Sequence, residues 1–195
     1  TFSRSSFVDG RPAGNDIATV PVQGGEAQPL VAVSDVVPGA VYHGMRWVPD
    51  GSRLYYSVSY PEREDARSGV WVVEADGSGQ RQVSHGSGWK RSPSYSPDGR
   101  RIVYAGQLKR PGLDRWESAE IFSISARDGS GRIRITNDRG EAQYPSFSPN
   151  GKKVLFVRHW NQLMSVNVDR TGLNKLYETP YGGGVLWTNW GPAAN

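Results

Sequence analysis

The chain has 195 residues, a hydrophobic content of 36% and a formal net charge of +4, from 23 basic and 19 acidic side chains. The basic residues are scattered, which argues against a nucleic-acid-binding groove, and no apolar run approaches the roughly 20 residues of a membrane span. Cysteine is absent, so disulfides and thiol catalysis are excluded. Seven Trp and nine Tyr residues predict a folded chain rather than a disordered one.

The N-terminal residues predict an incomplete β-sheet. Residues 1–6 match the end of one strand, and residues 15–31, "NDIATVPVQGGEAQPLV", contain two further strands around a Gly-Gly turn. These segments match the second, third and fourth strands of a four-stranded unit that recurs later in the chain.

Three copies of one tight turn follow. Pro-Asp-Gly stands at 49–51 and 97–99, and Pro-Asn-Gly at 149–151, so the turns begin 48 and 52 residues apart. Proline fixes φ, Asp or Asn bonds its own backbone, and glycine accepts a positive φ. The flanking residues alternate between apolar and polar, as in "RRIVYAG" (100–106). Each turn therefore predicts a β-hairpin.

Each hairpin is followed by two more β segments. A strand ending in a glycine turn covers 69–79, 120–131 and 162–172, and a shorter edge segment covers 80–84, 132–136 and 173–178. Four antiparallel strands per repeat are typical of a propeller blade. The sequence therefore predicts an all-β fold, a β-propeller, with whole blades near 37–84, 85–136 and 137–178.

The C-terminal stretch "VLWTNWGP" (185–192) matches a first strand, which is the strand that the N-terminal sheet lacks. One interpretation is a split blade formed by residues 1–36 and 179–195, giving about four blades in a single domain. The other is that the chain is part of a larger propeller. An open blade edge would then favour a homodimer, because proteins usually pair or cover exposed strand edges.

Taken together, "SYSPDGRRIVY" with "EIFSISARDG" and "SFSPNGKKVLF" with "LMSVNVDRTG" resemble the repeats of the TolB-like β-propeller family. The resemblance implies a rigid disc whose loops on one face, and whose central channel, bind a protein, peptide or glycan partner. We also expect a periplasmic or secreted location and no cofactor. In other relatives the propeller is the accessory domain of a larger hydrolase, a peptidase or amidohydrolase, whose catalytic residues lie in the neighbouring domain.

The sequence matches known catalytic motifs only weakly. Ser87 in "HGSG" (85–88) stands between glycines, but no amphipathic helix follows, so we interpret the stretch as a connector between blades. His43, His85 and His159 show no zinc spacing, although His43 and His85 fall at corresponding places just ahead of a first strand. We predict no catalytic residue and no metal site.

Two acidic turn strings, "EADGSG" (74–79) and "ARDGSG" (126–131), suggest calcium at first sight. They lack the further carboxylates of a complete calcium loop. We therefore expect Asp76 and Asp128 to shape their turns.

Recognition is expected in the connections between second and third strands, at 60–69, 107–120 and 158–162, because these should emerge on one face. Aromatic and Arg side chains supply most binding hot spots. The alternative for the two tryptophans in these loops is that they cover their own blade edges, whereas Trp47, Trp71, Trp187 and Trp190 are expected in the core. The predicted binding residues are Tyr60, Arg63, Arg110, Trp116, His159 and Trp160.

Three functions remain open. The first is a non-catalytic binding module that uses these loops, and the second is the accessory propeller of a hydrolase. The third is a propeller enzyme acting on a sugar, which would need paired carboxylates around the channel. The inserted loops offer Glu62, Glu64, Asp65, Asp114 and Glu117 for that role.

Overall fold

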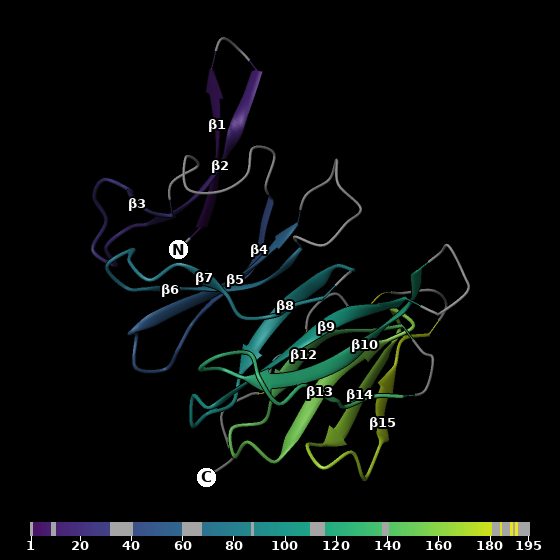
Figure 1. Ribbon diagram of the computed structural model, residues 1–195. Helices are drawn as coiled ribbons and strands as arrows, with labels where there is room; N and C mark the ends of the chain where they lie inside the picture. Colours follow the sequence, from purple (N-terminus) through teal and green to yellow (C-terminus); the bar gives the residue numbers. More distant parts are fainter. Residues whose placement is uncertain are drawn as a thin grey trace.

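The computed structural model describes residues 2–8, 11–31, 41–59, 68–86, 88–109, 116–137 and 141–180, together with residues 184, 188 and 190. Over these residues all the regular elements are β-strands, arranged as four antiparallel sheets (Figure 1). None of them forms a helix that could cross a membrane. The prediction of an all-β fold is confirmed.

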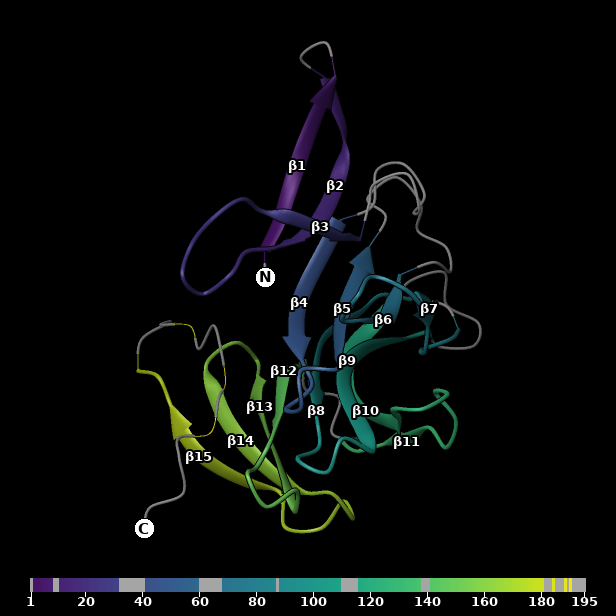
Figure 2. The ribbon, with the colours of Figure 1, turned by 90° about the vertical axis from the view of Figure 1, so that its left-hand side faces the viewer.

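The sheets follow one another in chain order along an arc (Figure 2). The first has three strands, β1 (Phe2–Val8), β2 (Arg11–Thr19) and β3 (Gln28–Val31). The second contains β4 (Val41–Trp47), β5 (Arg53–Ser59), β6 (Gly69–Glu74) and β7 (Arg81–Gln82).

The third sheet contains β8 (Lys90–Tyr95), β9 (Arg101–Lys109), β10 (Trp116–Ser125) and β11 (Ile133–Arg134). The fourth contains β12 (Ala142–Phe147), β13 (Lys153–Arg158), β14 (Gln162–Asn167) and β15 (Asn174–Glu178). Each sheet pairs its strands in sequence order, which is the arrangement of a propeller blade. The last three sheets lie within residues 37–84, 85–136 and 137–178.

The Pro-Asp-Gly motif forms the turn that the sequence predicts. The Gly51 amide donates to the Val48 carbonyl at 2.9 Å, and Gly51 has φ 70°. The Asp50 carboxylate accepts the Ser52 amide at 2.9 Å and the Ser52 hydroxyl at 2.7 Å. The same amide-to-carbonyl bond closes the turns at Gly99 and Gly151, so each repeat uses one hairpin geometry.

The core lies between neighbouring sheets. One buried cluster joins Val103 and Ile121 of the third sheet to Phe156 and Met164 of the fourth. A second joins Tyr55 of the second sheet to residues of the third, and a third cluster links the first two sheets. Blade-on-blade packing of apolar faces therefore holds the fold together.

Two details of the sequence prediction are wrong. The expected loop at 107–120 is largely strand, because β9 continues to Lys109 and β10 begins at Trp116, with these two residues paired. His43 does not correspond to His85, because it lies within β4 opposite Ser57, whereas the matching position in β8 is Arg91, opposite Ala105. The spacing of 48 residues between the first two hairpin turns, at 49–51 and 97–99, gives the same match.

Candidate functional site

The first strands of the last three sheets, β4, β8 and β12, lie side by side. Each carries a β-bulge at the same repeat position, where the pairing register with the second strand shifts. The bulged residues are left-handed: Gly44 has φ 59°, Ser92 φ 54° and Tyr144 φ 53°. Non-glycine residues adopt this conformation at a cost and are concentrated at functional sites.

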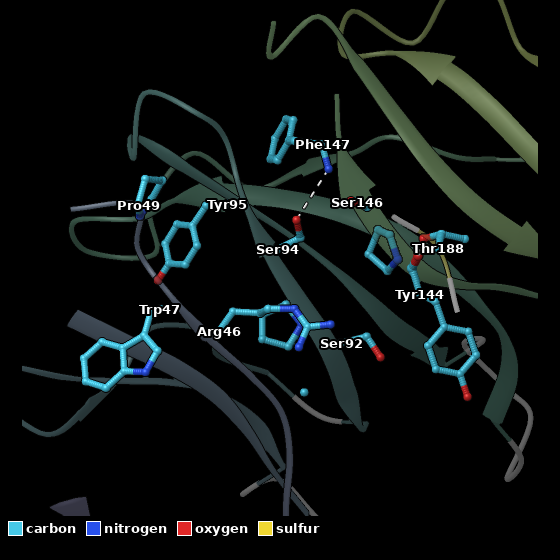
Figure 3. A pocket seen from close by; sticks show the side chains of 13 residues that line it. Arg46, Trp47, Pro49, Ser92, Ser94, Tyr95, Tyr144, Ser146, Phe147 and Thr188 are labelled. Carbon is cyan, nitrogen blue, oxygen red and sulfur yellow. Dashed lines mark hydrogen bonds between the residues drawn. The ribbon is translucent and has the colours of Figure 1, made fainter. Parts of the chain in front are cut away.

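The three bulges border one pocket of about 530 Å³ (Figure 3). Gly44 allows β4 to approach β8 closely, since a Cβ on Gly44 would lie 3.1 Å from the Ser92 Cα. The pocket therefore lies along the inner strands, where a propeller has its central channel. Its lining includes Arg46, Trp47, Ser92, Ser94, Tyr95, Tyr144, Ser146, Phe147 and Thr188.

The pocket is polar and aromatic. Arg46 is exposed, and its side chain extends across the pocket in Figure 3, with Trp47 on one side and Tyr144 on the other. The Tyr95 hydroxyl is buried and has no hydrogen-bond partner among the described residues, and it points to the side on which Trp47 lies. A pocket of this kind offers a charged donor, hydroxyls and aromatic faces to a ligand.

Trp160 contacts one residue of the pocket wall, Tyr144. It stands in the β13–β14 turn, and its ring meets that of Tyr144 edge to face at 6.3 Å. Its indole Nε1 donates to Glu141 Oε2 at 2.9 Å, and the His159 amide donates to the Glu141 carbonyl at 3.1 Å. Both turn residues are left-handed, with φ 49° for His159 and 64° for Trp160. These contacts with Glu141, just before β12, thus hold two bulky residues in the left-handed conformation that is more usual for Asn and Gly.

Of the predicted binding residues, the structure places Trp160 beside the pocket. His159 is exposed in the same turn. Tyr60, Arg63 and Arg110 lie outside the described residues, and so does the side chain of Trp116, whose backbone begins β10. Trp160 covers the start of its own blade, as the second alternative expects, and its ring also contacts Tyr144 of the pocket.

Sequence reasoning missed the inner-strand residues. A usable signal was present in "RSPSY" (91–95) and "QYPSF" (143–147), where a proline interrupts a strand pattern at one repeat position. Proline within a strand marks an edge or a bulge. The core assignment of Trp47 is also wrong: it is 36% exposed and lines the pocket at the end of β4.

The "HGSG" stretch is anchored by a buried lysine. Lys90 is 2% exposed, and its Nζ donates to the carbonyls of Gly86 at 2.7 Å and Gly88 at 3.0 Å. A longer bond of 3.3 Å reaches the Ser68 carbonyl. Burial, and secondarily the positive charge of Arg132, lowers the pKa of Lys90 to about 8. Ser87 itself lies outside the described residues, and a strand rather than a helix follows.

His43 is held within its own sheet. Its Nε2 lies 2.9 Å from the Ser59 hydroxyl. Burial, and then the nearby Arg91 guanidinium, lowers the pKa of His43. No group of three or more His, Asp or Glu side chains suited to a metal occurs in the part of the chain that the structure describes.

The acidic turns behave as expected. The Asp76 carboxylate accepts the Ser78 amide at 2.9 Å, and Asp128 accepts the Ser130 amide at 3.0 Å. Hydrogen bonds from the Ser130 hydroxyl, and then Ser125, lower the pKa of Asp128 to about 2. The turn-shaping role of both residues is confirmed.

Comparison with known families decides the relationship. The model of the TolB β-propeller domain matches residues 13–184. The chain belongs to the TolB β-propeller family.

Individual relatives of this TolB-type propeller differ in function. The Tol-Pal system protein TolB of Bordetella pertussis is 34% identical over 138 residues, which are 71% of this chain and 27% of that protein. The uncharacterised peptidase YuxL of Bacillus subtilis is 26% identical over 128 residues, 65% of this chain and 18% of the peptidase. A solved structure assigned as TolB from Agrobacterium tumefaciens superposes with a TM-score of 0.65 and 25% identity, covering 87% of this chain and 58% of the other.

The chain spans 16% to 36% of the length of the curated relatives it matches first. The similarity is therefore to their propeller repeats, and the activities of whole relatives do not follow from it.

Proposed function

We propose that this chain is a non-catalytic binding module that holds an extended peptide segment of a partner protein in the pocket between β4, β8 and β12. The observation that carries the proposal is the repetition of a left-handed bulge at Gly44, Ser92 and Tyr144, all three bordering one pocket. Bulges at equivalent places re-aim side chains toward a shared ligand.

The charges of the inner strands favour a ligand that carries a carboxylate. Arg46 lines the pocket, and Arg91 is exposed on the neighbouring strand, close enough to His43 to lower its pKa. The Glu141 carboxylate is engaged by Trp160 and Gln143. An acidic residue of the bound peptide would pair with Arg46, while the aromatic side chains contact its apolar residues.

The predicted loop residues complete this proposal. Tyr60, Arg63, Arg110, Trp116 and His159 would extend the contact surface from the pocket over the loop face. The TolB relative belongs to the Tol-Pal system, which supports a periplasmic or secreted location and a protein partner for this chain. We propose no nucleic-acid partner and no cofactor. A glycan is the alternative ligand class, because Tyr144 and Trp160 form an aromatic edge on which a sugar ring could stack.

A peptide selected on the chain tests the site. A displayed library of random peptides is enriched on the wild-type chain, and the dissociation constants of the best peptides are measured by calorimetry. Arg46→Glu is expected to weaken binding at least ~10-fold, because it places a like charge opposite the peptide carboxylate.

The matched control is Arg100→Glu, an equal charge change at an exposed residue beside the Pro-Asp-Gly turn. It is expected to change the affinity less than ~2-fold. Equal affinity for wild type and Arg46→Glu, or an equal loss in both variants, would contradict a peptide site in the pocket. If the chain binds oligosaccharides on an array in a way that depends on Arg46, and binds no peptide, the ligand of the pocket is a glycan rather than a peptide.

The second candidate is the accessory propeller of a hydrolase, favoured by the similarity to the Bacillus subtilis peptidase. The catalytic residues would then lie in another domain, and the same pocket would receive the peptide substrate. Arg46→Glu would in that case alter the KM of the complete enzyme for acidic peptides, with little change in kcat.

We also propose that β1 completes its sheet with the strand predicted at 185–192. Among the described residues β1 is an edge strand, paired with β2 alone. The Thr188 hydroxyl donates to the Tyr144 carbonyl, and the Trp190 indole donates to the Ser146 carbonyl at 3.0 Å, so these two residues lie beside β12. That is the place of the first strand of a next blade.

Light scattering of the purified chain tests this closure. A monomer of 21.4 kDa is expected when the split blade forms within one chain. A particle of twice that mass would contradict it and would assign the open blade edge to a homodimer.

A further inference from the structure

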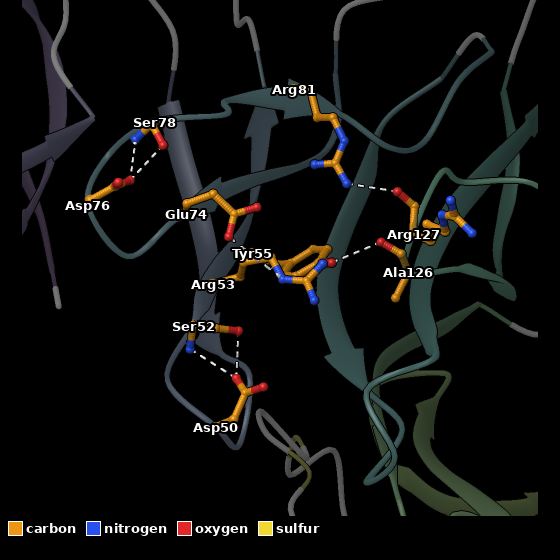
Figure 4. Close-up of polar contacts among 10 residues, drawn as sticks. All are labelled: Asp50, Ser52, Arg53, Tyr55, Glu74, Asp76, Ser78, Arg81, Ala126 and Arg127. Atoms are coloured by element: carbon orange, nitrogen blue, oxygen red, sulfur yellow. Dashed lines mark hydrogen bonds and ion pairs between the residues drawn. The ribbon is translucent and has the colours of Figure 1, made fainter.

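The interface between the second and third sheets contains a tyrosine wedge. Tyr55 of β5 is fully buried, and its hydroxyl donates to the Ala126 carbonyl of the next sheet at 2.9 Å (Figure 4). Its ring meets that of Tyr95 edge to face at 4.4 Å. Beside it, Arg81 Nη2 donates to the Arg127 carbonyl at 2.7 Å. One aromatic ring and one guanidinium therefore span this interface.

The next interface, between the third and fourth sheets, lacks both groups. Tyr55, Val72 and Arg81 are lateral neighbours across β5, β6 and β7, and the corresponding neighbours in the third sheet are Val103, Ser123 and Ile133. Valine thus stands at the position of the wedge tyrosine, and isoleucine at the position of the bridging arginine.

The groups that contact Tyr55 across its interface have equivalents between the third and fourth sheets. Ala126, whose carbonyl accepts the Tyr55 hydroxyl, donates its amide to the Arg100 carbonyl, and Val168 donates in the same way to the Lys152 carbonyl. Phe147 of β12 stands where Tyr95 stands in β8, as the hairpin spacing shows.

The missing ring leaves a groove of about 380 Å³. Its floor is apolar and buried, formed by Val103, Ile135 and Phe147, which belong to one cluster. Its rim exposes Ile133 and Val168, at 40% and 39%. Pro97 and Pro149 of two hairpin turns also line it, which places the groove away from the Trp160 end of the blades.

We propose that this groove is a second binding site, which takes the phenol ring of a tyrosine from a partner polypeptide. The ring would meet Phe147 as Tyr55 meets Tyr95, and its hydroxyl would donate to the Val168 carbonyl as Tyr55 donates to Ala126. Arg101 lines the groove at the repeat position of Arg53, which lies beside Tyr55 in Figure 4. A guanidinium there complements the electron-rich ring of a phenol.

This site goes beyond the proposed channel function and does not rest on it. The two pockets have a single lining residue in common, Phe147, among the described residues. Failure of one proposal would therefore leave the other standing.

Titration with p-cresol, the side chain of tyrosine as a free molecule, tests the groove. Backbone amide NMR is expected to show shifts at Val103, Phe147 and Val168, with a dissociation constant of about 1 mM. Toluene lacks the hydroxyl and is expected to bind at least ~5-fold more weakly. Equal binding of toluene would overturn the assigned hydrogen bond, and shifts elsewhere only would overturn the site.

Two variants close the groove in different ways. Val103→Tyr supplies the wedge that the second sheet already has, and it is expected to abolish p-cresol binding and to raise the melting temperature. Ile133→Trp changes an exposed rim residue and covers the groove with a bulky ring, so it tests the site even where Val103→Tyr fails to fold. Retention of p-cresol binding at wild-type affinity in Ile133→Trp would contradict the proposal.

The reciprocal variant is Tyr55→Val, which opens the equivalent groove between the second and third sheets. It is expected to create a second p-cresol site, with new shifts at Tyr95 and Ala126. Absence of this second site in a folded Tyr55→Val chain would overturn the argument that the wedge position controls ligand access.

Discussion

Replacement of Gly129 by alanine is expected to lower the free energy of unfolding by ~3 to 5 kcal/mol. Gly129 has φ +74°, which strains any residue with a Cβ. A Cβ at this position would also overlap the Val83 carbonyl oxygen, which belongs to the preceding repeat. Because the overlap is with backbone, it can be relieved only by moving one blade against its neighbour.

Gly99→Ala is the matched control. Gly99 has φ +67° in its Pro-Asp-Gly turn, but a Cβ there would meet nothing within 4 Å. It is expected to cost ~1 kcal/mol from backbone strain alone. Urea denaturation of both variants measures the difference. Similar losses in the two variants would mean that the blade contact at Val83 does not constrain the fold.

The stability of the chain is expected to rise by ~2 kcal/mol between pH 7 and 9.5 because of Lys90. Its pKa is about 8 in the folded chain, lowered from 10.5 by burial and by Arg132. Below pH 8 Lys90 is protonated in both the folded and the unfolded chain, and burial of its charge lowers the stability of the folded chain. Between pH 8 and about 10.4 the unfolded state binds more protons, so stability increases as pH rises.

Lys90→Met isolates this contribution. The variant removes the titrating group while keeping a long side chain, so its unfolding free energy is expected to vary less over the same pH range. The difference between wild type and variant, measured by urea denaturation at each pH, cancels the titration of other groups. A parallel pH dependence in both chains would contradict the assignment to Lys90.

The repeat pattern was sufficient to predict the fold because each blade contains the same local sequence signals. The Pro-Asp-Gly turns, the alternating strands and the short fourth strands all act between residues close in sequence. Each blade could be outlined without knowledge of its neighbours. The family resemblance pointed to the same architecture.

The pocket could not be predicted in the same way because it depends on how blades meet. Ser92 and Tyr144 become pocket residues through a left-handed bulge, and only the proline that follows each of them hinted at it. Trp47 looked like a core residue because it lies within a strand pattern. It is exposed at the end of β4, where it lines the pocket instead.

The groove between the third and fourth sheets illustrates a further limit. Val103 and Tyr55 are both ordinary strand residues, and neither suggests a cavity by itself. The cavity follows from the pair, since one interface contains a ring that the next one lacks. Comparison of equivalent positions within one chain was needed to recognise it.

The most direct test of the central claim is hydrogen–deuterium exchange of the chain with and without a peptide selected on it. The peptide is expected to slow exchange at 43–47, 91–95 and 143–147 on the inner strands, and at 159–160 beside Tyr144. Slower exchange confined to the hairpin turns at 48–52, 96–100 and 148–152 would contradict that claim, because the bound peptide would then lie on the opposite end of the blades.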